Sequence, residues 1–150
     1  MSRIDTINKR ILQTLQREGR ISNTDLAERV GLSPSACLRR VQELERSGVI
    51  AGYRAVLDRK RLGIGFLAYV TVGLSNHTRA TQATFERAME LASEVRECHN
   101  VAGGVEYLLR VEVADLESYK RFHTDRLGAL SQVATITTYV VMASPKDARA

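Results

Sequence analysis

The stretch SNTDLAERVGLSPSACLRRVQELERSG, residues 22–48, carries the start and stop signals of two consecutive helices. Ser22 is a helix-capping residue type, and Ser33 followed by Pro34 marks a second start, because proline at the first helical position gives up no hydrogen bond. Gly31 ends the first of these helices, so only a Gly-Leu dipeptide separates it from the cap of the next. A turn this short is typical of a helix-turn-helix, whose second helix enters the major groove of DNA.

The second of these helices, predicted from Pro34 to about Arg46, has an apolar and a polar face. Cys37, Val41 and Leu44 fall on one stripe at 100° per residue, and we interpret Cys37 as a core side chain rather than a nucleophile or a metal ligand. The polar face begins with residues suited to base edges, since arginine can bind guanine with two hydrogen bonds and a small side chain can contact a thymine methyl. The base-edge candidates are Ser35, Ala36, Arg39 and Arg40, of which Arg40 can reach a base or a phosphate.

A second set of residues is predicted to bind DNA phosphates, which position a protein on the duplex without specifying a sequence. The start of the helix after residue 21 can offer backbone N–H groups to a phosphate, and the residues beyond the helix-turn-helix carry basic side chains. The phosphate candidates are Ser22, Asn23, Thr24, Arg54, Arg59, Lys60 and Arg61.

The helix-turn-helix is flanked by one more helix and by a short strand-rich run. Apolar residues recur at helical spacing through residues 4–19, and Gly19 is predicted to end that helix in the left-handed conformation. Residues 49–58, VIAGYRAVLD, combine β-branched and aromatic side chains and predict the hairpin of a wing. We therefore expect a winged helix-turn-helix DNA-binding domain over residues 1–57, followed by a linker over residues 58–65.

The positive charge of the chain is concentrated in this first part. Residues 1–61 hold 13 Lys+Arg and 7 Asp+Glu, whereas residues 62–150 hold 9 and 10, so the net charges are +6 and −1 within a total of +5. A basic module joined to a nearly neutral one favours double-stranded DNA as the partner, ahead of a membrane surface. Charge alone leaves an ordinary solvated basic surface as the alternative.

The second part of the chain alternates between strand and helix patterns in the order β-α-β-β-α-β. That order is the ferredoxin-like plan, an antiparallel sheet with both helices on one face, so the fold class expected for the chain is α+β. The uncovered face of the sheet is expected to pair with a second copy of the chain, because it includes apolar side chains such as Leu108. We expect this domain over residues 66–145 and a tail over residues 146–150. Its elements are predicted at residues 66–74, about 80–95, two strands joined by a two-residue turn at Gly103 and Gly104, about 116–130 and 133–142.

Nothing in the sequence has the spacing of a catalytic or metal-binding site. His77, His99 and His123 lie in different predicted elements, and Cys98 and His99 point to opposite faces of a strand. We therefore predict that the protein is not an enzyme and has no metal or other cofactor. The sequence has no run of roughly 18 uncharged apolar residues and no apolar signal segment, so we expect a cytoplasmic, nucleoid-associated protein with no membrane partner.

Three segments carry a resemblance to the leucine-responsive and asparagine-responsive regulators, the Lrp/AsnC or feast/famine family. They are residues 4–58, residues 97–111 (ECHNVAGGVEYLLRV) and residues 137–142 (TTYVVM), so the resemblance covers nearly the whole chain. It implies a winged helix-turn-helix joined to a ferredoxin-like domain called RAM, in homodimers and often in octamers of four dimers. It also implies a sequence-specific transcription regulator, commonly of amino-acid metabolism or transport, that is modulated by an amino acid or a related small metabolite; many members bind an amino acid between dimers.

The same resemblance implies where the effector binds. An α-amino acid needs N–H donors for its carboxylate and an acceptor for its ammonium. Family members usually carry the pattern Gly-Asp-x-Asp-Tyr, and the match here, residues 103–107, keeps an acid at Glu106 but has Gly104 in place of the first acidic residue. A ligand-independent architectural protein that wraps DNA is therefore the alternative. The implied effector-binding residues are Ala102, Gly103, Gly104 and Val105, with Thr135 and Thr137 as polar neighbours.

Overall fold

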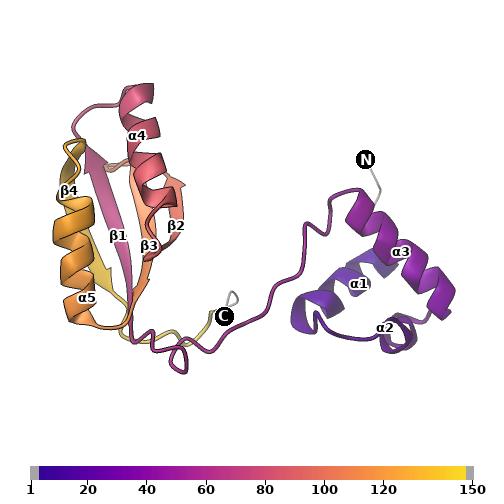
Figure 1. The fold of residues 1–150 in the computed structure, drawn as a ribbon. Coiled ribbons are helices and arrows are strands. Elements are labelled where there is room, and N and C mark those ends of the chain that lie inside the picture. Colours follow the sequence, from indigo (N-terminus) through magenta and orange to yellow (C-terminus); the bar gives the residue numbers. More distant parts are fainter. Residues whose placement is uncertain (1–3, 148–150) are drawn as a thin grey trace. The chain divides into compact units, whose positions relative to one another are not determined.

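The structure, a computed structural model, describes residues 4–147 of the chain. It divides into two compact units, with the boundary between Val56 and Leu57 (Figure 1). Each unit has a hydrophobic core of its own and is described by itself.

The first unit contains three helices, α1 (Thr6–Arg17), α2 (Asn23–Val30) and α3 (Pro34–Arg46). Each begins at a side-chain cap that accepts a hydrogen bond from a backbone N–H of the first turn: Asp5, Ser22 and Ser33 at 2.7, 3.1 and 3.3 Å. Gly31 ends α2 in the left-handed conformation at φ 74°, which glycine adopts without steric cost. The predicted helix-turn-helix is thus confirmed, with two residues between α2 and the cap of α3.

The core of this unit joins the inner faces of the three helices. Ile11 of α1, Leu26 and Val30 of α2, and Cys37 and Leu44 of α3 are all buried. Burial raises the pKa of the Cys37 thiol, whose residue has no exposed surface, so it packs as a small apolar side chain. Because Cys37 faces inward, the residues on the opposite face of α3 point to solvent.

Two local predictions for this unit are wrong. Gly19 does not have a positive φ, because α1 ends at Glu18, whose N–H donates to Thr14 O at 2.9 Å without a left-handed residue. The hairpin predicted for residues 49–58 is absent as well, since these residues form no strand in the described chain. Ile50 packs against the helical core, but Val49, Tyr53, Val56 and Leu57 stay exposed, so the run has no continuous buried face that would favour pairing. Tyr53 Oη instead donates to Glu45 Oε1 at 2.8 Å.

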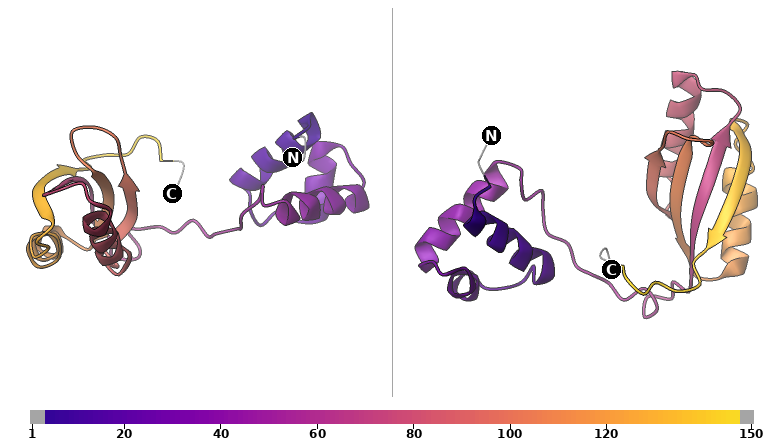
Figure 2. Two further views of the ribbon diagram at one scale, coloured as in Figure 1. Left: turned by 90° about the horizontal axis from the view of Figure 1, so that it is seen from above. Right: turned by 180° about the vertical axis from the view of Figure 1, so that it is seen from behind.

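The second unit is a four-stranded sheet with helices on one face. Its elements are β1 (Phe66–Leu74), α4 (Arg79–Glu90), β2 (Val95–Asn100), β3 (Tyr107–Val113), α5 (Leu116–Arg121), its continuation η1 (Phe122–Leu127) and β4 (Val133–Val140). The strands are antiparallel neighbours in the order β2-β3-β1-β4. Figures 1 and 2 show α4 and α5 on the same side of this sheet. The ferredoxin-like fold is confirmed.

Side chains alternate strictly across the two central strands. Val70 and Val72 of β1 and Leu109 and Val111 of β3 point to the helices and are fully buried, together with Phe85 of α4. The residues between them in sequence face the uncovered side, which carries the buried ion pair of Arg110 and Glu112 as well as Leu67, Tyr69, Thr71, Leu108, Thr137 and Tyr139. One side of the sheet is therefore core and the other is a surface.

The connections differ from the prediction in two places. Helix α4 ends at Glu90, and Val95 starts β2 instead of ending the helix. The hairpin between β2 and β3 is longer than the predicted Gly-Gly turn, because Val101 N–H donates to Glu106 O at 2.8 Å and leaves residues 102–105 as a four-residue loop. Neither glycine of this loop has the positive φ that a tight two-residue turn requires.

Candidate nucleic-acid interface and effector site

The first half of α3 presents an open polar face. Ser35 and Arg39 are exposed and lie on the side opposite the buried Cys37, and Ala36, which is partly exposed, lies on the flank of that polar face. Arg39 has no hydrogen bond or ion pair with any residue in the described part of the chain. Its guanidinium is therefore available to an outside partner.

Arg40 is positioned differently from the other base-edge candidates. Its Nη1 donates to Asp5 Oδ2 at 2.7 Å and to Asn8 Oδ1 at 3.0 Å, so the side chain is bound to the start of α1. The backbone N–H of Asn8 and then the Arg40 guanidinium lower the pKa of the Asp5 carboxyl from its ordinary value of 3.8. Arg40 is therefore engaged within the fold, and its contact with a base or a phosphate stays a prediction. The sequence does not reveal these partners, because they lie 35 and 32 positions away.

At the start of α2, two of the candidate side chains already form hydrogen bonds within the helix-turn-helix. Ser22 Oγ accepts from Asp25 N–H, and Asn23 Nδ2 donates to Pro34 O at 2.8 Å, which ties α2 to α3. Thr24 remains exposed, and the N–H groups of Asn23 and Thr24 lie in the first turn, where no helical carbonyl can accept from them. The phosphate candidates here are thus the two backbone N–H groups and the Thr24 hydroxyl.

The four basic candidates after α3 divide into two groups. Arg54 and Lys60 are exposed and have no ion pair with any residue between 4 and 147, and Arg61 makes only an exposed pair with Asp58 at 3.5 Å. Arg59 instead donates to Glu112 Oε1 and to Asp147 Oδ2, each at 3.1 Å. Hydrogen bonding to Asp147 raises the pKa of Arg59. This side chain is therefore engaged within the second unit, and its contact with a phosphate stays a prediction.

Of the candidate effector residues, Thr135 lies directly beside Gly73 on the uncovered face of the sheet. Gly73 of β1 pairs with Thr135 of β4, and a Cβ atom at position 73 would collide with Thr135 Oγ1 and lie 3.6 Å from Glu106 Oε2. The glycine therefore leaves room for the Thr135 hydroxyl and the Glu106 carboxylate to lie close to the backbone of β1. Thr137 lies two residues further along β4, opposite Thr71, and is displaced from this cluster by roughly 7 Å.

Glu106 connects this cluster to the hairpin loop. Its Oε2 accepts from Leu74 N–H at 2.7 Å, its Oε1 lies 2.9 Å from His77 Nδ1, and its side chain is only 15% exposed. Ala102, Gly103 and Gly104 precede it in an exposed loop, and Val105 is half-buried. The arrangement offers a carboxylate acceptor for an ammonium group beside open backbone.

Gly73, Glu106 and His77 were missing from the residues assigned to this site on sequence. A glycine inside a strand whose other positions alternate between core and surface indicates close approach of another group, which is the signal that could have found Gly73. Glu106 belongs to the motif from which the loop was chosen. His77 lies between β1 and α4, and nothing in the sequence connects it to Glu106.

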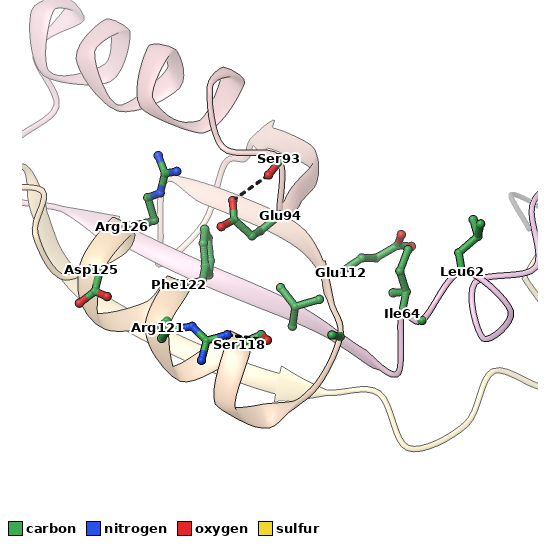
Figure 3. A pocket seen from close by; sticks show the side chains of 13 residues that line it. Leu62, Ile64, Ser93, Glu94, Glu112, Ser118, Arg121, Phe122, Asp125 and Arg126 are labelled. Carbon is green, nitrogen blue, oxygen red and sulfur yellow. Dashed lines mark hydrogen bonds between the residues drawn. The ribbon is translucent and has the colours of Figure 1, made fainter.

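A hollow of about 570 Å³ lies elsewhere in the second unit, among the linker residues 62–64, the end of β3 and helix α5 (Figure 3). Arg121 on its rim is already engaged by Glu117 and Ser118, at 3.1 and 3.0 Å. None of the predicted effector residues lines this hollow.

Two features are absent from the part of the chain that the structure describes. Among residues 4–147 there is no group of three or more His, Cys, Asp or Glu side chains that could hold a metal ion. Within the same residues, no helix has the length and apolar character needed to cross a bilayer.

Family models match both parts of the chain. A model described as the Lrp/AsnC ligand binding domain matches residues 67–150, and one described as winged helix-turn-helix DNA-binding matches residues 4–51. The leucine-responsive regulatory proteins of Salmonella typhimurium and Escherichia coli are each 40% identical to this chain over 144 residues, which are 96% of this chain and 88% of theirs. The similarity therefore spans both units.

Solved structures agree with these matches. A transcriptional regulator from Neisseria meningitidis in complex with L-methionine superposes with a TM-score of 0.92 at 31% identity, covering 95% of this chain and 92% of that one. A feast or famine regulatory protein from M. tuberculosis complexed with L-methionine gives a TM-score of 0.83 at 27% identity, covering 98% and 97%. Both similar proteins are regulators solved with the same amino acid.

Proposed function

The chain belongs to the Lrp/AsnC family of transcription regulators, and from this premise we propose that Ser35, Ala36 and Arg39 read bases in the major groove of double-stranded DNA. The observation that carries this proposal is the exposed, unpaired Arg39 on the face of α3 opposite the buried Cys37. In a helix-turn-helix, the N-terminal half of the second helix contacts base edges. An arginine there can hold guanine O6 and N7 together.

Backbone and basic side chains on both sides of α3 would bind the phosphates. The proposed contacts are the N–H groups of Asn23 and Thr24 and the side chains of Arg54, Lys60 and Arg61. Selection of duplexes from a random pool, followed by binding titrations at several salt concentrations, tests the proposal. Enrichment of one sequence with a steep salt dependence is expected, and equal binding to all duplexes would contradict base reading.

We also propose that the second unit binds an amino acid at the cluster around Gly73. Glu106 would accept the α-ammonium, open N–H groups of residues 102–105 would donate to the carboxylate, and the Thr135 hydroxyl would add a polar contact. The match to a ligand-binding family model and the methionine complexes of similar regulators support this effector over a ligand-independent DNA-wrapping role. The loss of the acid at Gly104 leaves Glu106 as the carboxylate of the loop.

A thermal-shift screen with the twenty amino acids tests the effector. A ligand at about 100 times its dissociation constant adds roughly 2.7 kcal/mol to the free energy of unfolding. We expect a shift with L-methionine or another amino acid. The absence of a shift with all twenty would contradict the effector.

We propose the uncovered face of the sheet as a contact between copies of the chain. This face carries Leu67, Tyr69, Leu108 and Tyr139, which are apolar enough to favour burial against a second sheet. The protein would be a homodimer or an octamer of dimers, in the cytoplasm with the nucleoid. Light scattering coupled to gel filtration gives the mass, and a monomer at micromolar concentration would contradict the proposal.

The domain assignment follows from the same proposals. Residues 1–57 would form the DNA-binding domain, residues 58–65 the linker, residues 66–145 the effector and oligomerisation domain, and residues 146–150 the tail. Since similar proteins regulate transcription, we propose no catalytic activity and no cofactor for this chain.

A further inference from the structure

The two carboxylate oxygens of Glu106 have different partners: one accepts a hydrogen bond from the backbone, and the other contacts an exposed side chain. Oε2 accepts from the Leu74 backbone N–H at 2.7 Å, which fixes the carboxylate against the end of β1. Oε1 lies 2.9 Å from Nδ1 of His77, a distance that suits a salt bridge when the imidazole is protonated. The side chain of Glu106 is 15% exposed, whereas that of His77 is 77% exposed. An exposed imidazole therefore covers a mostly buried carboxylate.

The backbone on both sides of His77 is held by a compact turn. Asn76 Oδ1 accepts hydrogen bonds from Thr78 N–H at 3.1 Å, from Thr78 Oγ1 at 2.9 Å and from Thr81 Oγ1 at 2.7 Å. Thr78 Oγ1 in turn caps α4 by accepting from Thr81 N–H. The imidazole can thus leave Glu106 by rotating about its own side-chain bonds, while the turn keeps its shape.

We propose that His77 is a built-in competitor of the effector: its imidazole occupies the position beside Glu106 Oε1 that the α-ammonium of the amino acid takes. This inference rests on the proposed effector site and adds the residue that sets its affinity. An amino acid binds only to the fraction of molecules in which His77 has moved away, so its apparent dissociation constant is the intrinsic one divided by that fraction. His77 therefore raises the concentration at which the regulator responds.

The proposal predicts an order of affinities that a merely structural histidine would not give. His77→Ala empties the position beside Oε1 and should tighten amino-acid binding by roughly three- to tenfold, the size of one partly exposed hydrogen bond to a charged group. His77→Lys puts a permanent ammonium there and should weaken binding relative to the wild type. If His77 only ordered the turn, both replacements would weaken binding.

Isothermal titration of the full chain with each of the twenty L-amino acids, L-methionine first, measures these affinities. His99→Ala is the matched control, because His99 is also an exposed histidine of this unit and lies 3.2 Å from a carboxylate oxygen of Glu97. Its affinity should equal that of the wild type. The 2-hydroxy acid corresponding to the tightest amino acid lacks the ammonium, and so should bind His77→Ala no better than the wild type.

Each outcome decides between the proposals. Equal affinity of the wild type and His77→Ala for every amino acid that binds, or weaker binding by both His77 variants, would overturn the competitor role and leave the effector site intact. A gain for the 2-hydroxy acid equal to that for the amino acid would also overturn it. If no amino acid binds to the wild type or to His77→Ala, the effector proposal itself fails.

Discussion

Arg40 Nη1 lies 2.7 Å from Asp5 Oδ2, so the helix proposed to enter DNA is tied to the residue that caps the first helix. The pKa of this carboxyl is lowered in the folded protein, first by the Asn8 N–H and then by Arg40. A lowered carboxyl pKa stabilises the fold above the unfolded value, and this contribution disappears as the pH falls through the folded value.

Replacing Asp5 with Asn should therefore flatten the acid side of the stability profile. The variant should have a lower Tm than the wild type at pH 7, and the difference should shrink as the pH falls below the ordinary carboxyl pKa of 3.8 and through the lowered pKa of the folded state. Arg40→Ala should show a smaller change in the same direction, because it removes only the second cause of the shift. Thermal unfolding followed by circular dichroism measures both, and a constant difference across this range would contradict the assignment.

Arg39→Ala should weaken DNA binding unequally across sequences. The variant should lose about 1–3 kcal/mol on the preferred site and much less on duplexes that lack the contacted guanine. Lys60→Ala is the comparison, since a phosphate contact is blind to sequence: it should weaken all duplexes alike and lower the slope of log K against log salt by roughly one. Fluorescence anisotropy on a set of site variants distinguishes them, and a uniform effect of Arg39→Ala would remove it from base reading.

Glu112→Gln should destabilise the second unit strongly. The Glu112 side chain is 6% exposed and lies 2.5 Å from Arg110 Nη1 and 3.1 Å from Arg59 Nη1, while Nε and Nη2 of the buried Arg110 have no hydrogen-bond partner. Neutralising the acid leaves the buried Arg110 guanidinium with only its longer ion pair to Asp147 at 3.7 Å, which Arg59 shares, at a cost of about 3 kcal/mol.

Glu117→Gln is the matched control, because its pair with Arg121 is exposed and should contribute only about 0.3–0.5 kcal/mol. Urea unfolding measures the two variants. Arg59→Ala should cost less stability than Glu112→Gln and should leave the salt slope of DNA binding unchanged. A reduced salt dependence of DNA binding in Arg59→Ala would indicate that Arg59 contacts a phosphate.

Gly73→Ala should be costly, and the cost should depend on Thr135. The new Cβ would collide with Thr135 Oγ1, which predicts a loss of about 1–3 kcal/mol in the free energy of unfolding. Adding Thr135→Ala removes that oxygen and leaves the Thr135 Cβ 3.7 Å away, an ordinary contact, so the double variant should regain most of the loss. A double-mutant cycle by urea unfolding tests this coupling, and purely additive effects would contradict the close approach.

Local signals in the sequence predicted the fold well. The helix caps Ser22 and Ser33 and the helix end at Gly31 are each recognised from residue types within one short stretch of sequence. The order of strand and helix patterns predicts the sheet. The prediction of a wing hairpin was wrong because the strand propensity of a segment does not show whether a partner strand is present. The predicted length of the β2–β3 loop was wrong, because a Gly-Gly pair is typical of a two-residue turn. The hydrogen bond from Val101 N–H to Glu106 O instead closes a four-residue loop.

The candidate sites were predicted less completely, for a different reason. Arg39 and Arg40 are adjacent and chemically alike, yet one is exposed and the other is held by residues 32 and 35 positions away. Arg59 and Glu112 are 53 positions apart. Glu106 forms an ion pair with His77, which lies in the loop between β1 and α4. Such pairs depend on the folded arrangement of several elements, which periodicity and residue type do not encode.

Tyr53 provides an optical means of observing the helix-turn-helix unit separately. The chain has five tyrosines and no tryptophan, and Tyr53 is the only tyrosine before residue 57 in the sequence. Tyr53 is exposed as a residue, but partial desolvation of its phenol and the hydrogen bond that it donates to Glu45 raise the pKa of Tyr53 to about 12, so this phenol ionises at higher pH than an ordinary one near 10. The difference in tyrosine emission between the wild type and Tyr53→Phe would follow the unfolding of the DNA-binding unit. The other four tyrosines lie in the second unit and contribute equally to the emission of both proteins.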